Sequence, residues 1–423
     1  MGSELSDWLA RLERAHPSAV ELGLERVARV RDAMGLQPDF PVILVGGTNG
    51  KGSACAYLEA ILRAQGFKTG LYTSPHLLRY NERVRIDGVE ASDADIAAGL
   101  QAVEEARGGV SLTYFEHGTL GAVWQFVRAG VEVAILEVGL GGRLDAVNVF
   151  EPAVSVVTTV DLDHQGWLGD SREAIGFEKA GIFRPGKPAV CGDADPPQSL
   201  LDHARAIGAK LLRSGRDFVF AGDDGTWRFR LGECELTGLP LPALPGGFQL
   251  GNAAAALAAL SAAADILPVS PAAISRGLSG ARLPGRFQRL AGPVEVVLDV
   301  AHNPQSARAL ADNLGSDPAK GKSWAVFAML ADKDADGVIA ALAGCFDAWF
   351  VAGLGGGRGR SGESLAARVR AQSDAPTEAF ADPLAAFRAA KLRAGESDRI
   401  TVFGSFYTVA EILNAYSDVS PSS

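Results

Sequence analysis

The segment PVILVGGTNGKGS, residues 41–53, brings together residue types that suit the binding of phosphate groups. An apolar run ends in a cluster of glycines, and a lysine and a serine follow where a helix is expected to begin. Glycines let backbone N–H groups turn toward an anion, and the helix N-terminus presents further N–H groups to it. Lys51 adds a positive charge for terminal phosphates, and Ser53 offers a hydroxyl oxygen to a magnesium ion. The segment therefore predicts a phosphate-binding loop.

This segment departs from the common phosphate-loop pattern G-x-x-x-x-G-K-[ST] in two places. Val45 occupies the first glycine position, and the hydroxyl residue comes two positions after the lysine instead of one. A glycine-rich turn at the end of a strand is also often no more than a tight turn. Phosphate binding is the favoured interpretation, and residues elsewhere in the chain must support it.

Polar side chains also stand at the ends of the next predicted strands, where open α/β sheets bind their ligands. They are Ser74 after the run 68–73, Glu137 near the end of 131–138, and Asp161, Asp163 and His164 after 153–159, with Lys179 on a helix expected at 171–182. The carboxyl ends of parallel strands share one edge of a sheet. We therefore expect these side chains to lie near the phosphate loop.

Each of these side chains also has an interpretation that involves no chemistry. Glu137 ends an apolar run, so its carboxylate needs a metal or another cation, and Arg143 could supply an ion pair instead. Magnesium prefers oxygen ligands, so a metal role for His164 needs independent support. Lys179 is most simply a solvated lysine or an ion-pair partner, and the aspartates at 161–163 are then ordinary turn residues.

The 423 residues exceed the usual size of one hydrophobic core, so two domains are expected. Val/Ile/Leu-rich runs alternate with helical patterns, which predicts a mostly parallel sheet buried on both faces. A small antiparallel hairpin set is expected at 216–238 and a hinge at 281–290, after which the alternation resumes. The expected strands are 41–46, 68–73, 131–138, 153–159 and 187–191 before the hinge, and 295–300, 323–330, 348–354 and 399–405 after it. The expected helices include 52–65, 92–107, 115–129, 171–182, 249–265 and 271–279, then 305–314, 335–343, 363–372, 382–391 and 406–415.

Further candidates follow the hinge. The segment LDVAHNP, residues 298–304, places Asp299 and His302 at a strand end just before a helix. Arg286 lies in the predicted hinge and could reach phosphate groups once the domains close. In the structural interpretation, the Asn-Pro pair of this segment only marks the start of a helix.

Composition limits the classes of partner. The net charge is −10, from 40 basic and 50 acidic residues without a basic block, so nucleic acid is not an expected partner. No apolar run reaches the length of a membrane span, and the N-terminal segment reads as an amphipathic helix and not as a signal peptide. We expect a cytoplasmic monomer without a membrane partner. The four cysteines are far apart, which predicts buried free thiols and no zinc site or disulfide framework: Cys55, Cys191, Cys234 and Cys345.

Together these motifs closely resemble those of the folylpolyglutamate synthase/dihydrofolate synthase family of ATP-dependent Mur-type ligases. The long motifs at 136–148 and 161–182 are the most specific, whereas the phosphate loop alone is not. In the family's order, the matching segments are GTNGKGS (47–53), TSPHLLRYNERVRIDG (73–88), TYFEHGTLGA (113–122), LEVGLGGRLDAVN (136–148), DLDHQGWLGDSREAIGFEKAGI (161–182), FQLGNAAAAL (248–257), LPGRF (283–287), DVAHNP (299–304) and FGSFY (403–407).

The resemblance implies a fold and a role for each matching residue. The fold is α/β: an ATP-binding domain at 1–284 with a phosphate loop and a mostly parallel sheet, and a smaller Rossmann-like domain at 285–423, with the active site between them. Lys51, His164 and Lys179 are implied as catalytic. Ser53, Ser74 and Glu137 are assigned to one magnesium ion, and Glu137, His164 and a carbamylated Lys179 to a second. The implied ATP contacts are Thr48, Asn49, Gly50, Lys51, Gly52, Ser53, Asn252, Arg286, Asp299 and His302. The implied contacts of the pterin-bearing acid are Arg83, Thr113, Tyr114, Phe115, Glu116, Leu144, Asp145 and Ala146. From the sequence, a role in the hydrophobic core explains Phe115 almost as well.

The implied activity is the ATP-dependent joining of L-glutamate to dihydropteroate, to the glutamate tail of folates, or to both, through an acyl phosphate. Three other functions stay open. A peptidoglycan-precursor ligase would carry a nucleotide domain before its phosphate loop, which lies within about fifty residues of the start here. A P-loop kinase or GTPase would not need the group Glu137, His164 and Lys179. A non-catalytic nucleotide-binding module would release no ADP in response to glutamate.

Overall fold

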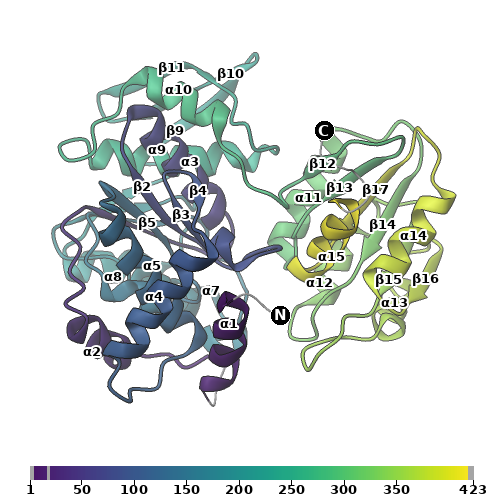
Figure 1. Cartoon of the computed structure of the whole chain (residues 1–423). Coiled ribbons are helices and arrows are strands. Elements are labelled where there is room, and N and C mark those ends of the chain that lie inside the picture. Colours follow the sequence, from purple (N-terminus) through teal and green to yellow (C-terminus); the bar gives the residue numbers. More distant parts are fainter. Residues whose placement is uncertain (1–3, 17–19, 418–423) are drawn as a thin grey trace. The chain divides into compact units, whose positions relative to one another are not determined.

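The computed structural model describes residues 4–16 and 20–417 and divides into two compact units (Figure 1). Unit 1 comprises Met1–Ala243 and Gln249–Arg282, and unit 2 comprises Leu244–Phe248 and Leu283–Ser423. Each unit is built on its own parallel-rich sheet flanked by helices. The predicted α/β class, with a larger mostly parallel sheet and a second, smaller α/β unit, is confirmed.

The large sheet of unit 1 has eight strands in the order β4-β3-β2-β5-β1-β6-β7-β8. The six strands from β2 to β8 in this order are parallel, and β3 and β4 add an antiparallel edge. All five residues of β1 are buried, as expected of a strand covered on both faces. The bounds are β1 Val42–Gly46, β2 Thr69–Tyr72, β3 Val84–Ile86, β4 Val89–Glu90, β5 Val133–Glu137, β6 Val154–Val157, β7 Pro188–Cys191 and β8 Lys210–Arg213.

Several helices of unit 1 begin at a side chain that accepts a hydrogen bond from a free N–H group of the first turn. Ser92, Thr113 and Ser171 accept hydrogen bonds at the starts of α4, α5 and α7. The bounds are α1 Glu4–Ala15, α2 Glu25–Ala33, α3 Lys51–Gln65, α4 Asp93–Ala106, α5 Tyr114–Ala129, α6 Gln165–Leu168, α7 Arg172–Ala180, α8 Gln198–Ile207, α9 Phe248–Ala262 and α10 Pro271–Gly280, with short 3-10 turns at Tyr80–Arg83 and Ala146–Val149.

A three-stranded antiparallel sheet in the order β11-β10-β9 confirms the hairpin set predicted from the alternating runs. Its strands are β9 Phe218–Asp223, β10 Thr226–Leu231 and β11 Cys234–Pro240. The sheet has its own small core, in which Phe218 and Phe229 lie 6.1 Å apart between ring centroids. It precedes α9, the alanine-rich helix that carries Asn252.

Unit 2 is a six-stranded sheet in the order β12-β13-β17-β14-β15-β16, with β12 antiparallel and the others parallel. Stacked aromatic rings of Phe327, Phe346 and Phe403 form the centre of its core. The strands are β12 Gln288–Leu290, β13 Glu295–Leu298, β14 Ser323–Phe327, β15 Ala348–Ala352, β16 Thr377–Phe380 and β17 Arg399–Phe403. The helices are α11 Pro304–Ser316, α12 Ala335–Leu342, α13 Gly362–Arg370, α14 Pro383–Arg393 and α15 Phe406–Ser417.

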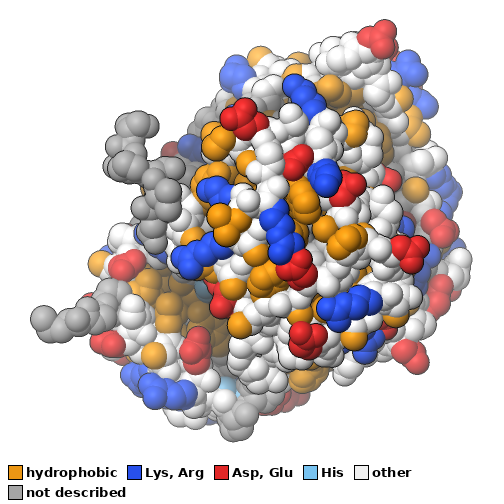
Figure 2. Space-filling model, turned by 90° about the vertical axis from the view of Figure 1, so that its right-hand side faces the viewer, with side chains coloured by type: hydrophobic (Ala, Val, Ile, Leu, Met, Phe, Trp, Pro, Cys, Tyr) orange, Lys and Arg blue, Asp and Glu red, His pale blue; other side chains and the backbone are white. Residues whose placement is uncertain are grey.

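Charge is mixed over the molecular face shown in Figure 2, where basic and acidic side chains alternate among hydrophobic ones. Among the residues that the structure describes, no helix is both long and apolar enough to cross a membrane.

Two expectations need correction, and four strands were not expected. Residues 288–290 of the predicted hinge form β12, because they pair with β13 at the edge of the sheet. Only Cys55 and Cys191 are buried thiols, whereas Cys234 is exposed on the small sheet and Cys345 is partly exposed. The sequence analysis also missed four short strands whose pairing depends on distant partners, namely β3, β4, β8 and β16.

The contact between α3 and α10 leads to a stability prediction. A Cβ atom on Gly277 would lie 2.5 Å from the Cα atom of Ile61, and a helix backbone cannot move aside cheaply. We expect Gly277→Ala to lower the free energy of unfolding by about 1–3 kcal/mol, measured by urea denaturation. Gly280→Ala on the same helix is the control, since no atom lies within 4 Å of its Cβ position. Equal stability of the two variants would contradict the tight packing.

Candidate active site

The phosphate loop connects β1 to α3 and has a backbone shape that only glycine adopts easily. Gly47 has φ 139° and Gly50 has φ 86°. A Cβ atom would lie 1.9 Å from Thr158 Oγ1 at Gly47, and 2.3 Å from Asn252 Oδ1 at Gly50. The loop is therefore held between β6 and α9 so closely that side chains at these two positions are excluded.

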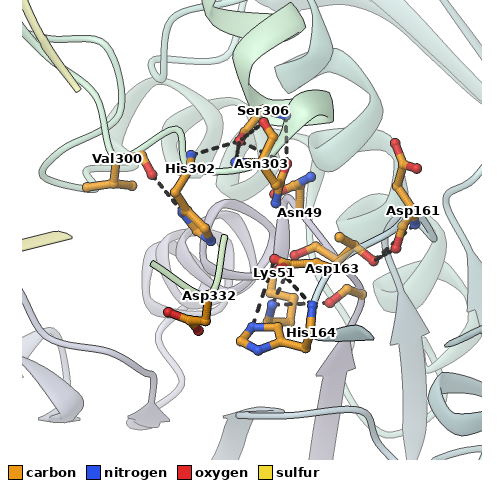
Figure 3. A network of polar contacts seen from close by, with 12 residues as sticks. Asn49, Lys51, Asp161, Asp163, His164, Val300, His302, Asn303, Ser306 and Asp332 are labelled. Atoms are coloured by element: carbon orange, nitrogen blue, oxygen red, sulfur yellow. Dashed lines mark hydrogen bonds and ion pairs between the residues drawn. The ribbon is translucent and has the colours of Figure 1, made fainter. Parts of the chain in front are cut away.

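Hydrogen bonds join the loop to the segment after β6. Thr48 Oγ1 donates to the carbonyl of Asp161 at 3.0 Å, and Asn49 N donates to Thr159 Oγ1 at 3.2 Å. Lys51 Nζ donates to the carbonyls of Gly47 at 3.1 Å and Thr48 at 3.2 Å, so its ammonium group lies over the loop (Figure 3). The ammonium group is thus held against the loop at the N-terminal end of α3.

Two further predicted nucleotide contacts lie against the same loop. The side chain of Ser53 is almost fully buried in the first turn of α3, and its Oγ accepts a hydrogen bond from Gln249 Nε2 at 3.3 Å. Asn252 Nδ2 donates to Gln249 Oε1 at 3.0 Å. Gln249 is a residue that the sequence analysis missed, and it links two predicted site residues that lie about two hundred positions apart.

Glu137 ends β5 directly beside the loop, since it is the register partner of Val45 on β1. Its carboxylate is buried and accepts a hydrogen bond from the backbone N–H of Ser74 at 3.2 Å. Arg143 forms its ion pair with Glu178, at 2.8 Å, so the alternative in which it neutralises Glu137 is wrong. The structure thus brings together Glu137, Ser74 and the phosphate loop, as predicted from the strand ends.

Lys179 is buried on α7, which corrects the interpretation of a solvated lysine. Burial, and to a smaller extent the positive charge of Lys51, lower the pKa of its amine to about 7. Asp163 opposes this shift, which shows that its carboxylate also lies near the amine. His164 has a left-handed backbone with φ 53°, and its Nε2 lies 3.8 Å from Asp163 Oδ2 (Figure 3).

The segment 113–116 starts α5 and packs toward the loop after β5. Thr113 and Glu116 form a capping box, in which Glu116 N donates to Thr113 Oγ1 at 3.2 Å and Thr113 N donates to Glu116 Oε2 at 2.8 Å. Phe115 lies 5.8 Å from Tyr72 between ring centroids and is only partly buried, so its ring is not a pure core residue. Glu116 is buried and pairs with Arg26 at 3.0 Å, which gives its carboxylate a structural role.

Asp145 is a buried carboxyl group close to this segment in the fold. It accepts hydrogen bonds from the backbone N–H groups of Leu140 at 2.8 Å and Val147 at 3.1 Å. Burial outweighs these bonds and raises the pKa of the Asp145 carboxyl to about 7. Its neighbour Leu144 is partly exposed and Ala146 is buried.

Arg83 lies at the end of the 3-10 turn after β2, beside aromatic rings. Its guanidinium carbon is 5.3 Å from the ring centroid of Tyr80 and 5.5 Å from that of Tyr114. Its Nε donates to His76 Nδ1 at 2.8 Å. Burial and the charge of Arg83 lower the pKa of His76 to about 4. His76 stands in a matching motif, but nothing in its sequence position predicts a contact with Arg83.

In unit 2, the predicted nucleotide contacts stand around the carboxyl end of β13. Asp299 is buried and accepts hydrogen bonds from the backbone N–H groups of Phe287 at 2.9 Å and Ala301 at 2.8 Å. Burial raises the pKa of the Asp299 carboxyl, and Arg286 opposes this shift. Arg286 and His302 both pack on Phe406, at 5.4 and 6.1 Å from its ring centroid. Phe406 is thus a supporting residue that the sequence analysis did not single out.

The donors that could hold a divalent cation are mainly oxygens. Among residues 4–16 and 20–417, no three His, Cys, Asp or Glu side chains are grouped as a metal site. Only two members of the predicted ligand set, Glu137 and His164, are of these residue types. The other members are serines and a lysine. Buried hydroxyl and carboxylate oxygens beside a phosphate loop fit magnesium, which needs few protein ligands and retains waters and phosphate oxygens.

Comparison with known proteins agrees with this arrangement. The Mur ligase middle domain model matches residues 45–260, and the Mur ligase glutamate ligase domain model matches residues 285–406. The dihydrofolate synthase/folylpolyglutamate synthase of Escherichia coli is 45% identical over 412 residues, which cover 97% of this chain and 95% of that protein. This chain belongs to the dihydrofolate synthase/folylpolyglutamate synthase family of Mur ligases.

Solved structures of this family have the same fold. The structure of E. coli FolC in complex with DHPP and ADP has a TM-score of 0.94 at 44% identity and covers 99% of this chain and 98% of that one. A bifunctional folylpolyglutamate synthase/dihydrofolate synthase with Mn, AMPPNP and L-glutamate bound has a TM-score of 0.90 at 47% identity, with 97% of each chain covered.

The buried amine of Lys179 leads to a pH-dependent prediction. Folding lowers its pKa from 10.5 to about 7, so between these values the unfolded chain binds the additional proton. The wild-type protein should therefore gain stability as the pH rises from 7 toward 10. Lys179→Met removes this titration, so at pH 7 the variant should be more stable than wild type. This difference in the free energy of unfolding should be smaller at pH 10 than at pH 7 by at least about 1.4 kcal/mol, the equivalent of one pKa unit.

Urea denaturation at both pH values, in buffer depleted of carbon dioxide, metal and nucleotide, measures this difference. Lys210→Met serves as the reference, because Lys210 is an exposed lysine on β8. A Lys179→Met advantage that stays constant between the two pH values would show that the buried amine is not titrating in this range.

Proposed function

We propose that this protein joins L-glutamate to dihydropteroate and to the glutamate tail of folates, with ATP converted to ADP and phosphate. One observation carries the proposal: a phosphate loop, the buried carboxylate of Glu137 and the buried amine of Lys179 share one edge of the unit 1 sheet. Relatives that align over nearly the whole chain are named for these two reactions. Solved relatives hold ADP, DHPP or L-glutamate.

The chemistry explains why ATP is needed. A carboxylate is a poor acyl donor, because oxide cannot leave. Attack of the substrate carboxylate on the γ-phosphorus of ATP forms a C–O–P linkage and releases ADP. The amine of glutamate then attacks the acyl carbon, loses a proton and expels phosphate, which leaves an amide. Lys51 and the N–H groups of the loop offset the negative charge that gathers when one anion attacks another.

Two magnesium ions are proposed, and the oxygen donors present fit them. Ser53, Ser74 and Glu137 would hold one ion, and Glu137, His164 and Lys179 the other. A bound divalent cation would neutralise phosphate charge and polarise the phosphoryl group. The manganese in a solved relative supports a divalent ion in this family.

The remaining predicted roles form part of the same proposal. Asn252 and the loop residues Thr48–Ser53 would contact the nucleotide, with Asp299, His302 and Arg286 as the nucleotide contacts of unit 2. The pocket for the pterin-bearing acid would be formed by Thr113, Tyr114, Phe115, Glu116, Leu144, Asp145 and Ala146. The partial exposure of Phe115 and the neutral-range pKa of Asp145 support this pocket.

Carbamylation of Lys179 is a further part of the proposal. A neutral amine attacks carbon dioxide, and the pKa of about 7 leaves much of this lysine neutral at physiological pH. The carbamate would convert a repelling ammonium into an anionic oxygen donor. We expect Lys179→Ala to lower the glutamate-dependent rate at least about 100-fold. A carbamate signal should appear by 13C NMR with labelled bicarbonate in wild type only. Full activity of Lys179→Ala would end this proposal.

A phosphate-release assay tests the main proposal. Purified protein with ATP, magnesium and L-glutamate should release phosphate when dihydropteroate is added, and separately when tetrahydrofolate is added. Omission of glutamate should reduce release to background, because the acyl phosphate then has no amine acceptor. Activity with tetrahydrofolate alone would remove the first reaction, and inactivity with both acids would overturn the proposal.

A further inference from the structure

A cavity of about 250 Å³ lies at the edge of the unit 1 sheet, between α8 and the edge strand β8. Strands β6 and β7 separate β8 from β1, which places β8 about 14 Å from the strand that leads into the phosphate loop. The reaction proposed above uses none of the residues around this cavity. Its lining combines apolar side chains with arginines: Leu201, Ala204 and Leu211, and Arg205, Arg213 and Arg216.

Arg213 is the last residue of β8, and its backbone is fixed from two sides. Its N–H donates to Asp217 Oδ2 at 2.8 Å, and the N–H of Asp217 donates back to the carbonyl of Arg213 at 2.9 Å. The next residue, Ser214, donates through its N–H to the carbonyl of Cys191 on β7 at 2.9 Å. Leu211 and Arg213 are two positions apart on the strand, so both side chains lie on the face that α8 covers.

The three arginines differ in their partners. Arg205 Nη1 donates to Asp202 Oδ1 at 2.9 Å, and Arg216 Nε lies 3.9 Å from Asp217 Oδ1. The guanidinium of Arg213 forms no hydrogen bond or ion pair with any described residue, and its Nε is buried without an acceptor. The terminal nitrogens of Arg213 are therefore the donors that this side chain offers to the cavity. Carboxylates accompany two of the three positive charges, and the third has none.

The size and the charge of the cavity indicate the kind of ligand. An apolar cavity of about 150 Å³ is large enough for benzene, so the present cavity has room for a ring-sized apolar group and a small anionic group. The paired N–H donors of an arginine match the two oxygens of a carboxylate. One unaccompanied positive charge also matches one carboxylate, whereas a phosphate monoester carries nearly two negative charges at pH 7.

We propose that this cavity binds a small organic monocarboxylate. The carboxylate lies on the terminal nitrogens of Arg213, and the apolar body of the ligand packs against Leu201 and Leu211. Arg205 and Arg216 add a positive rim that their own carboxylate partners weaken. The site is separate from the phosphate loop, and the inference does not depend on the proposed ligase reaction.

Isothermal titration calorimetry of the full chain with sodium benzoate tests the proposal, because benzoate combines one apolar ring with one carboxylate. We expect a Kd of about 1 mM, which is in the range for a ligand of this size. Benzamide has the same shape without the charge and should bind at least about tenfold more weakly. Phenyl phosphate should bind no more tightly than benzoate, since its second negative charge has no cation left to meet.

Two arginine variants locate the bound anion. Arg213→Gln removes the unaccompanied charge and should weaken benzoate binding at least about tenfold. Arg205→Gln is the matched control, because Arg205 lines the same cavity but is paired with Asp202, and it should change the affinity less than about threefold.

A cavity-filling variant tests the apolar part of the site and keeps the test open if Arg213→Gln does not fold. Ala209 lines the cavity and is partly exposed, so Ala209→Leu should occupy the space for the ring and weaken benzoate binding at least about tenfold. No benzoate binding at about 20 mM, an affinity that Arg213→Gln leaves unchanged, or tighter binding of phenyl phosphate would each overturn the inference. The proposed function is tested separately, by phosphate release from the wild-type protein.

Discussion

Burial of charge at one edge of the unit 1 sheet is the constraint on which the site depends. Glu137 and Lys179 are both almost fully buried, at 5% and 4% exposure, and Asp145 is buried as well. Burial of single charges is costly, which explains why the pKa values of Lys179 and Asp145 move toward neutrality. Hydrogen bonds and opposite charges nearby lower the free-energy cost of keeping such groups charged.

The sheet topology produces this concentration of charge. Strand β1 lies between β5 and β6, so the phosphate loop has Glu137 on one side and the segment of Asp161 to His164 on the other. Close packing then removes freedom from the loop, since Thr158 and Asn252 fill the space that side chains at Gly47 and Gly50 would need. At both positions the packing alone therefore requires glycine. A looser loop would leave the N–H groups unable to converge on a phosphate.

Aromatic side chains support the cationic groups in both units. Tyr80 and Tyr114 flank Arg83 in unit 1, and Phe406 lies against Arg286 in unit 2. A ring face attracts a cation without neutralising it. This differs from the ion pairs of Arg143 and Arg79, whose charges are already balanced by carboxylates.

The sequence alone determined the class of fold and the strand ends that carry the candidate polar side chains, and it predicted that the glycine-rich loop binds phosphate. These features follow from local patterns: hydrophobic runs bounded by Gly, Pro and Asp, and a lysine at the start of a helix. The weaker expectations concerned single side chains. The sequence left open whether Arg143 pairs with Glu137 and whether the side chain of Lys179 is solvated. Both questions depended on which helix packs against which strand.

The tertiary structure decided which side chains contact one another and which short strands form the edges of the sheets. Gln249 joins Ser53 to Asn252, and His76 meets Arg83, although no local pattern marks either contact. The strands β3, β4, β8 and β16 were missed because short edge strands owe their conformation to hydrogen bonds with distant residues. Local sequence encodes the periodicity and the turns, whereas the burial that shifts a pKa arises only when remote segments pack together.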